Sequence, residues 1–458
     1  MEKREKFSSR LGFILISAGC AVGLGNVWRF PYIVGKNGGA IFVVIYLAFL
    51  LLLGLPILVM EFAVGRASQR SVAKSFRLLE PEGTKWHLFS YVALGGNYLL
   101  MMFYTSVGGW MLAYVFKALS GHLHGVTTQG AQLVFNQLLA SPGSMFFWMI
   151  LIVLISFGIC SLGLQNGVER ITKLMMSSLF VIILVLAIRS ITLPGAAEGL
   201  KFYLVPNVEH VKEQGIINVI FAAMGQAFFT LSIGIGSMSI FGSYIGKDRS
   251  LTGESLSICF LDTLVALFAG LIIFPACSAF GVNPGEGPGL VFVTLPGIFN
   301  QMPFGKLWEF LFFVFMTFAA MSTIIAVFEN ILSFCMDMWG ISRTKAVLIN
   351  AVLVILLSLP CVFGFNLLSF IKPLGAGSTI QDLEDFIVSN NLLPLGSLVF
   401  LLFCTRKRGW GWDNFIKEAD MGRGLKFPKA LRFYVSYILP LIVLIIFVFG
   451  YQQKFFAQ

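Results

Sequence analysis

Hydrophobic residues form long unbroken runs along this chain, and short polar segments separate them. The runs are about as long as the 20 residues that a helix needs to cross roughly 30 Å of hydrocarbon. They are too continuous for membrane β-strands, which alternate over about ten residues. Because a helix satisfies its backbone groups internally, the pattern predicts an all-α membrane protein. The predicted spans lie near residues 11–34, 40–64, 87–118, 145–163, 166–188, 217–245, 254–281, 306–338, 345–366, 374–404 and 431–451.

Composition supports the same class of protein. Of 458 residues, 57% are hydrophobic and only 12% are charged, against about 25% in ordinary soluble domains. The lipid bilayer is therefore an expected partner. No cleavable signal peptide is evident before the first run, since no small-residue cleavage site follows a short apolar core.

The net charge of +10 has a distribution that predicts orientation. If the N-terminus is cytoplasmic, most Lys and Arg residues fall in the inner segments, as the positive-inside rule requires. After eleven spans the C-terminus would then lie outside. The basic residues are spread over several loops and form no single stripe, so nucleic acid is not an expected partner.

Candidate enzyme chemistry is scarce. All seven cysteines fall inside predicted spans, where Cys behaves as a small apolar residue, and this predicts neither disulfides nor a metal framework. His122 and His124 could bind a metal from their outer loop, although a solvated pair is the simpler interpretation. No nucleophile stands beside a base, and no strand precedes the glycines of the first span. The sequence predicts a protein that is not an enzyme.

Glycines interrupt two of the runs in the middle of the membrane. The first run contains Gly23-Leu-Gly25-Asn26, and the sixth contains Thr230-Leu-Ser-Ile-Gly-Ile-Gly236. Each run opens a block of five, and paired interruptions of this kind indicate an inverted-repeat transporter with its site at the midplane. Glycines can also serve close helix packing. Two interruptions at corresponding positions, each beside a polar residue, favour broken helices.

Polar side chains at membrane depth point to cation binding. Glu61 and Asp262 lie within predicted spans, where a charged group costs about 2.5–3.5 kcal/mol even on insertion scales. A sodium ion could compensate Asp262, although a protonated side chain bonded to a neighbouring helix is an alternative. Ala319, Ser322 and Thr323 share one face of the eighth span. Their oxygens could bind a cation, or the hydroxyls could simply bond to their own helix.

These residues carry a family resemblance. Gly23-Leu-Gly-Asn-Val-Trp-Arg-Phe-Pro31, followed by Asn37-Gly-Gly39, resembles the first-span signature of the neurotransmitter:sodium symporters. The resemblance implies the leucine-transporter fold, a five-plus-five inverted-repeat bundle with broken helices 1 and 6, here with one extra C-terminal helix. It implies one membrane domain over 1–458, with repeats at 11–188 and 217–404 and an eleventh helix at 431–451. Eleven spans resemble the bacterial members, which implies a bacterial inner membrane.

The resemblance also implies two sodium ions. The first would be bound by the Ala21 carbonyl, Asn26, Thr230, Asp262 and the substrate carboxylate. The second would be bound by the carbonyls of Gly19, Val22 and Ala319 and by the hydroxyls of Ser322 and Thr323. Asp262 stands where the family usually has Asn, so the charge of the first site is open.

A substrate site and two gates follow from the same resemblance. The substrate would contact Ala21, Leu24, Gly25, Leu100, Tyr104, Phe229, Thr230, Ser232, Ile235, Thr323 and Val327. The outer gate would use Arg29 and Asp385 with Tyr104 and Phe229, and the inner gate would use Arg4, Phe7, Tyr244 and Asp337. A Phe stands where the family often has Trp at the inner gate.

Two positions bear on the substrate and the ions. Gly23 occupies the place where monoamine carriers of the family have Asp, which favours a small neutral amino acid, and the apolar pocket favours an aromatic or branched side chain. Near the family's chloride site Tyr46, Gln226 and Thr230 remain, but Ala266 replaces a hydroxyl. We expect the Asp262 carboxylate to replace chloride, so that chloride is not required.

The sequence thus predicts sodium-coupled uptake of a hydrophobic amino acid by alternating access. A channel would be an alternative, but paired gates argue against it. An amino-acid sensor would need a signalling appendage, and neither terminus is long enough to be one. A monomer or weak dimer is expected.

Overall fold

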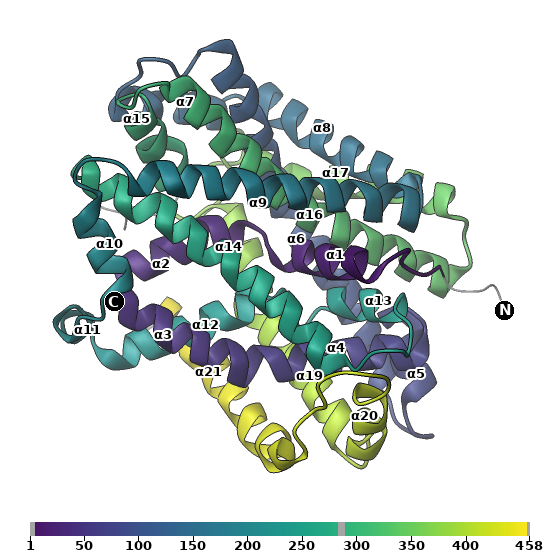
Figure 1. The fold of residues 1–458 in the computed structure, drawn as a ribbon. Helices are drawn as coiled ribbons and strands as arrows, with labels where there is room; N and C mark the ends of the chain where they lie inside the picture. The colour runs from purple at the N-terminus through teal and green to yellow at the C-terminus, as the bar shows by residue number, and fades with distance from the viewer. Residues whose placement is uncertain (1–4, 283–288, 456–458) are drawn as a thin grey trace.

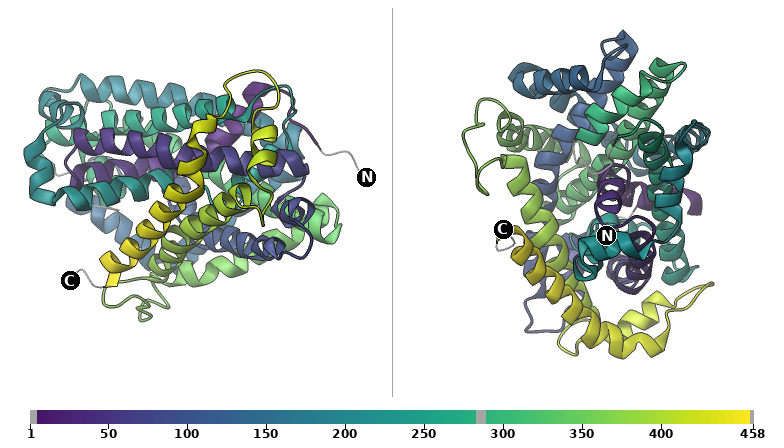
Figure 2. Two further views of the ribbon diagram at one scale, coloured as in Figure 1. Left: turned by 90° about the horizontal axis from the view of Figure 1, so that it is seen from below. Right: turned by 90° about the vertical axis from the view of Figure 1, so that its left-hand side faces the viewer.

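The computed structural model describes residues 5–282 and 289–455, and within them the chain is a bundle of helices without β-strands (Figure 1). The long helices run roughly along one direction, and the described chain begins and ends at opposite ends of the bundle (Figures 1 and 2). The predicted odd number of crossings would place them there. Because the described elements are all helices, the predicted all-α class is confirmed.

Nine stretches of the described chain are long and apolar enough to cross a membrane, and all nine coincide with predicted runs. Two of them are continuous through a π-helical turn, α3 into α4 and α18 into α19. The stretches are built from α3 (Ala40–Phe49) with α4 (Leu55–Ser68), α6 (Phe89–Ser120), α8 (Pro142–Ser161), α9 (Arg170–Ile191), α14 (Leu251–Ala279), α16 (Gly305–Trp339), α17 (Arg343–Phe363), α18 (Ile380–Ile387) with α19 (Leu393–Thr405), and α21 (Leu439–Phe455) with the turns before it.

The first and sixth predicted spans are broken helices. Helices α1 (Arg10–Ala21) and α2 (Phe30–Lys36) form one apolar span that bends by 56° at its break. In the sixth span α12 (Ile216–Thr230) ends, and α13 (Ser237–Ser243) begins after a stretch without helix. Ser232, Gly234 and Gly236 have φ angles of 51°, 102° and 75°, a region that disfavours most side chains and cannot continue a right-handed helix. The prediction of two broken spans is confirmed.

In the described residues six shorter helices lie between the spans, and the sequence pattern did not predict them. They are too short to cross a bilayer, and several carry polar residues on one face, so a search for apolar runs of about 20 residues passes over them. They are α5 (Val72–Leu79), α7 (Thr128–Ala140), α10 (Ala196–Leu204), α11 (Val208–Gln214), α15 (Leu295–Phe299) and α20 (Trp412–Ala419).

The broken first helix lies at the centre of the bundle. Helix α1 packs against α16, α14 and α9, and its residues from Gly12 to Ala21 are all buried (Figure 1). Gly65 of α4 allows the second broken helix to approach closely, since a Cβ there would lie 1.8 Å from the carbonyl oxygen of Ser239 in α13. Both breaks are thus enclosed by protein rather than lipid, where unpaired backbone groups can be tolerated.

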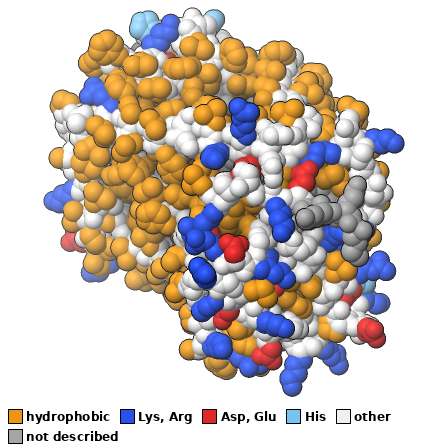
Figure 3. Space-filling model, turned by 45° about the vertical axis from the view of Figure 1, so that its right-hand side comes forward, with side chains coloured by type: hydrophobic (Ala, Val, Ile, Leu, Met, Phe, Trp, Pro, Cys, Tyr) orange, Lys and Arg blue, Asp and Glu red, His pale blue; other side chains and the backbone are white. Residues whose placement is uncertain are grey.

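The surface separates into apolar and charged regions. Figure 3 brings the N-terminal end of the bundle forward, and Lys, Arg, Asp and Glu side chains gather at that end. Most of the remaining visible face is hydrophobic. Exposed Leu, Val and Phe side chains on several of the long helices form this face, as expected of a protein whose surroundings are lipid.

Candidate functional site: the breaks of helices 1 and 6

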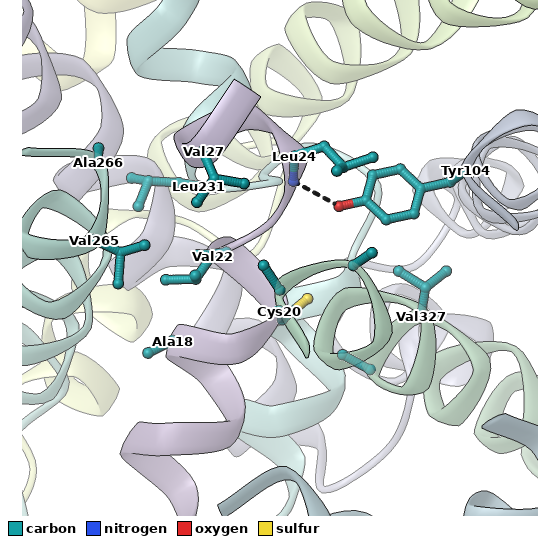
Figure 4. Packing of buried hydrophobic residues seen from close by; sticks show 14 of the residues in the cluster. Ala18, Cys20, Val22, Leu24, Val27, Tyr104, Leu231, Val265, Ala266 and Val327 are labelled. Atoms are coloured by element: carbon teal, nitrogen blue, oxygen red, sulfur yellow. Dashed lines mark hydrogen bonds between the residues drawn. The ribbon is translucent and has the colours of Figure 1, made fainter. Parts of the chain in front are cut away.

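The break after α1 exposes backbone groups to polar side chains of neighbouring helices. The chain leaves the helix at Val22, which has an extended backbone (φ −66°, ψ 99°). The backbone N–H of Leu24 then donates to the hydroxyl of Tyr104 in α6 at 3.0 Å (Figure 4). Gly23 leaves the space between them open, because a Cβ there would lie 2.3 Å from the Tyr104 hydroxyl. A side chain at position 23 would therefore displace Tyr104 from the break.

Oxygen atoms of α1 and α16 converge on the inner side of this break. The Ser322 hydroxyl donates to the carbonyls of Ala319 at 2.9 Å and Val22 at 3.4 Å. The Thr323 hydroxyl lies 3.3 Å from the carbonyls of both Gly19 and Val22. The structure thus brings together all five groups predicted for the second sodium site. They are neutral oxygens, a donor set that suits a hard monovalent cation.

The predicted side chains of the first sodium site also meet. The Asn26 side-chain amide donates to the Thr230 hydroxyl at 3.1 Å and to an Asp262 carboxylate oxygen at 2.8 Å. The Thr230 hydroxyl donates to the other Asp262 oxygen at 2.9 Å. All three side chains are buried, and Ala21 borders the cavity beside them. Oxygen atoms of Asn26, Thr230 and Asp262 therefore lie close enough together for one cation to bind among them.

The residues that the resemblance places at a chloride site lie near the same carboxylate. The Tyr46 hydroxyl lies 3.4 Å from the Thr230 hydroxyl. Gln226 donates to the Gly25 carbonyl at 3.0 Å, and its own side-chain oxygen is buried without a hydrogen-bond partner. Ala266, one turn after Asp262, is fully buried and supplies no hydroxyl. The Asp262 carboxylate, which accepts from Thr230 at 2.9 Å, thus places an acidic group of the protein in this region.

A small cavity of about 20 Å³ lies between the two breaks. A cavity needs about 10–15 Å³ to hold one water molecule, so the lining side chains must move apart before an amino acid can enter. Seven predicted substrate residues line it, together with three that were not predicted as contacts. The predicted residues are Ala21, Gly25, Leu100, Tyr104, Phe229, Ser232 and Thr323, and the additional ones are Gly23, Val388 and Leu393.

Four predicted substrate residues lie outside the cavity lining. Leu24 takes part through its backbone N–H, and Thr230 faces the Asp262 network. Ile235 is buried, and its carbonyl accepts from Asn97 at 2.9 Å. Val327 is also buried, and Figure 4 places it below the Tyr104 ring.

The outer-gate pair is not joined by an ion pair in the structure. The Arg29 guanidinium lies 4.2 Å from the centre of the Phe229 ring, while Asp385 accepts from the Ser389 hydroxyl at 2.7 Å. Arg29, Phe229 and Ser389 line an outer cavity of about 390 Å³. Phe229 lines both cavities and therefore lies at the boundary between the outer one and the central one.

The inner gate is partly described. Arg4 lies outside the described residues. The Phe7 ring packs edge-on against Tyr244, with 5.6 Å between centroids. Asp337 accepts from the backbone N–H of Ser71 at 2.7 Å and from Arg70 at 3.4 Å.

An ion-paired cluster beside Tyr244 was not predicted. The Tyr244 hydroxyl donates to Glu329 at 2.7 Å. Arg343 in turn contacts Glu329 at 2.7 Å and Glu5 at 3.3 Å. These contacts hold the N-terminal segment against α16 and α17 at the end of the bundle where the described chain begins.

Asn97 and Asn330, which support the second break, were also missed, whereas Glu61 was noted from its depth in the second span. Asn97 donates to the Ile235 carbonyl at 2.9 Å, and its oxygen accepts from Ser237 at 3.1 Å and Asn330 at 3.0 Å. Glu61 accepts from the backbone N–H of Gly234. Asn97 and Asn330 interrupt apolar runs of the sequence, and that signal could have identified them.

Two broken helices that meet beside converging oxygen atoms define an inverted-repeat membrane transporter. Comparison with known proteins gives the family: the sequence matches the sodium:neurotransmitter symporter family over residues 4–132 and 127–456. The chain belongs to this family and is a sodium-dependent transporter, not an enzyme. The resemblance seen in the first span is therefore confirmed.

Individual relatives agree over nearly the whole chain. An uncharacterized sodium-dependent transporter of Bacillus subtilis is 35% identical, with 97% of both chains covered. The sodium- and chloride-dependent GABA transporter 2 of Rattus norvegicus is 25% identical, covering 98% of this chain and 80% of its own. The crystal structure of MhsT in complex with L-phenylalanine superposes with a TM-score of 0.87 and 38% identity, covering 98% of this chain and 100% of that chain.

Proposed function

We infer that this protein couples the uptake of a neutral hydrophobic amino acid, aromatic or branched, to two sodium ions by alternating access. The observation that carries the proposal is the set of five oxygens from α1 and α16, with the Asp262 network on the other side of the same break. Two ions crossing with a zwitterion gain about 2.3 kcal/mol each per 100 mV of membrane potential. That gain supports concentrative uptake.

The space around Gly23 supports an amino acid over a monoamine. A Cβ at position 23 would lie 2.3 Å from the Tyr104 hydroxyl and 2.8 Å from that of Thr323, so no acidic side chain fits to bind an amine. The Leu24 N–H at the break and the Tyr104 hydroxyl, which bond to each other at 3.0 Å, are donors suited to a carboxylate. Apolar lining residues such as Leu100, Phe229 and Val388 suit a hydrophobic side chain. The phenylalanine in the MhsT complex is consistent with this class.

The cell location and the anion requirement are part of the proposal. The inner membrane of a bacterium, with the N-terminus in the cytoplasm and the C-terminus outside, agrees with the Lys and Arg distribution. The Asp262 carboxylate supports transport without chloride, because it places a fixed negative charge beside the first sodium site.

Purified protein in liposomes tests the function directly. Each of the twenty amino acids is offered under an inward sodium gradient, with an equal potassium gradient as the control. We expect concentrative uptake of aromatic or branched amino acids with sodium only. Uptake that equilibrates without accumulating would indicate a channel, and accumulation of polar amino acids alone would contradict the substrate class.

A further inference from the structure

A basic cavity lies where the inner ends of the tenth and eleventh spans meet, well away from the transport site. It measures about 930 Å³ and is lined by four cationic side chains together with the rings of Trp86 and Tyr437. Its cationic residues are Arg406, Lys407, Arg408 and Arg432. No Asp or Glu borders it in the part of the chain that the structure describes.

The cations of this cavity lack anionic partners. The Arg406 guanidinium lies 4.6 Å from the Tyr437 ring centre, and that of Arg432 lies 5.8 Å from the Trp412 ring centre. None of the four basic side chains forms an ion pair with another described residue. Like charges held in one cavity repel each other, so a bound anion would stabilise this end of the protein.

The cavity is placed at the edge of the apolar surface. Helix α19 ends at Thr405, and the last span begins near Lys429. Helix α21 packs against α19 at the periphery of the bundle, and most of α21 is open to the surroundings (Figures 1 and 2). On the last span Phe433, Tyr437 and Leu441 are 66%, 55% and 58% exposed. An apolar exposed strip thus leads from the membrane to a cluster of cations.

We propose that this cavity binds the phosphate headgroup of an anionic phospholipid, while the acyl chains lie along the exposed side chains of α21. Basic pockets between spans on the cytoplasmic side suit such headgroups. Arg406 and Arg432 bind the phosphodiester, and Tyr437 contacts the glycerol region. Assignment to the inner leaflet rests on the proposed orientation, whereas the binding itself does not depend on transport.

Native mass spectrometry of the purified full-length protein tests the site. Phosphatidylglycerol and phosphatidylcholine with identical acyl chains are added in equal amounts, and the retained lipid is measured. We expect preferential retention of phosphatidylglycerol. The double variant R406Q/R432Q should lower that retention roughly tenfold or more, given the usual strength of such contacts. The matched variant R77Q/K345Q removes two exposed charges from other inner segments and should retain the lipid.

Three outcomes would overturn the proposal. Equal retention of both lipids by the wild-type protein would do so without any variant, so the test remains informative if R406Q/R432Q does not fold. Equal losses in the two double variants would show a general charge effect instead of a site. Displacement of the lipid by inorganic phosphate at the same concentration would indicate a site for soluble anions. Because no uptake is measured, failure here leaves the proposed transport function untouched.

Discussion

At the scale of single residues, the site combines a neutral donor set with a charged one. Ser322 and Thr323 face carbonyls of α1, whereas Asn26 and Thr230 share the Asp262 carboxylate. The resemblance to the family predicted these groups from their positions. It did not predict that Arg29 would stack on Phe229 and form no ion pair with Asp385, because rotamer choice depends on packing that a sequence does not display.

Removing the Thr323 hydroxyl should weaken sodium binding. Thr323→Val keeps the shape of the side chain but deletes one of five oxygens, and a contact to a charged group contributes about 1.5–3 kcal/mol. The sodium concentration for half-maximal uptake should therefore rise roughly ten- to hundredfold. Thr317→Val is the matched control, since its hydroxyl only bonds to Phe313 of the same helix at 2.7 Å. Equal sodium dependence in both variants would contradict the assignment.

Asp262 should remove the need for chloride. Replacing chloride by gluconate during uptake should leave the rate of the wild-type protein essentially unchanged, because the carboxylate already lies beside Thr230. Asp262→Asn deletes this charge and should make uptake depend on chloride. A strict chloride requirement in the wild-type protein would refute the role given to Asp262.

At the scale of elements, apolar run length predicted the spans, and glycine spacing predicted which two are broken. The short helices were missed because a helix of five to thirteen residues leaves no long apolar run. One of them, α20, fastens the inner loops together. Arg66 of α4 is fully buried and contacts Glu418 of α20 at 2.6 Å and the Arg249 carbonyl at 2.6 Å. Arg66 and Glu418 lie 352 positions apart in the sequence, so no local sequence pattern could predict their contact.

Breaking this buried pair should destabilise the protein markedly. Arg66→Met takes away the closest partner of the buried Glu418 carboxylate and leaves it only the half-exposed Lys247 at 3.8 Å, a loss that typically costs about 3–5 kcal/mol. Arg10→Gln is the comparison: it breaks the Arg10–Glu254 contact at 3.0 Å, in which the arginine is 48% exposed, and such contacts contribute about 1 kcal/mol or less. The midpoint temperature of thermal unfolding in detergent should fall much further for Arg66→Met than for Arg10→Gln. Similar shifts would argue against a fastening role for α20.

At the scale of the whole molecule, the described chain begins and ends at opposite ends of the bundle, as the expected odd number of crossings would require. The charged end in Figure 3 is the end where the N-terminal segment lies, in agreement with the bias of Lys and Arg that the sequence displays. Nine of the eleven predicted spans are long apolar helices in the described chain, and hydropathy could predict them because lipid imposes a simple rule on length. The packing of α1 between α9, α14 and α16 could come only from the family, because all these faces are apolar.

Cysteine labelling should reveal the orientation. The seven native cysteines are all buried, so single exposed cysteines can be added to the natural chain. Gln452→Cys near the C-terminus should react with a membrane-impermeant maleimide in intact cells. Thr344→Cys, at the exposed start of α17, should react only after lysis. The reverse pattern would invert the proposed topology.

The Phe229 ring borders both the outer cavity and the central cavity. We expect a solute that passes from the outer cavity to the central one to displace this ring, which the Arg29 guanidinium covers at 4.2 Å. We therefore expect Arg29 to move before Phe229 when a solute enters the central cavity. An anion that bound the Arg29 guanidinium in the outer cavity would draw it away from the Phe229 ring and let the ring rotate. An uncharged bulky molecule in the same cavity would leave Arg29 over the ring.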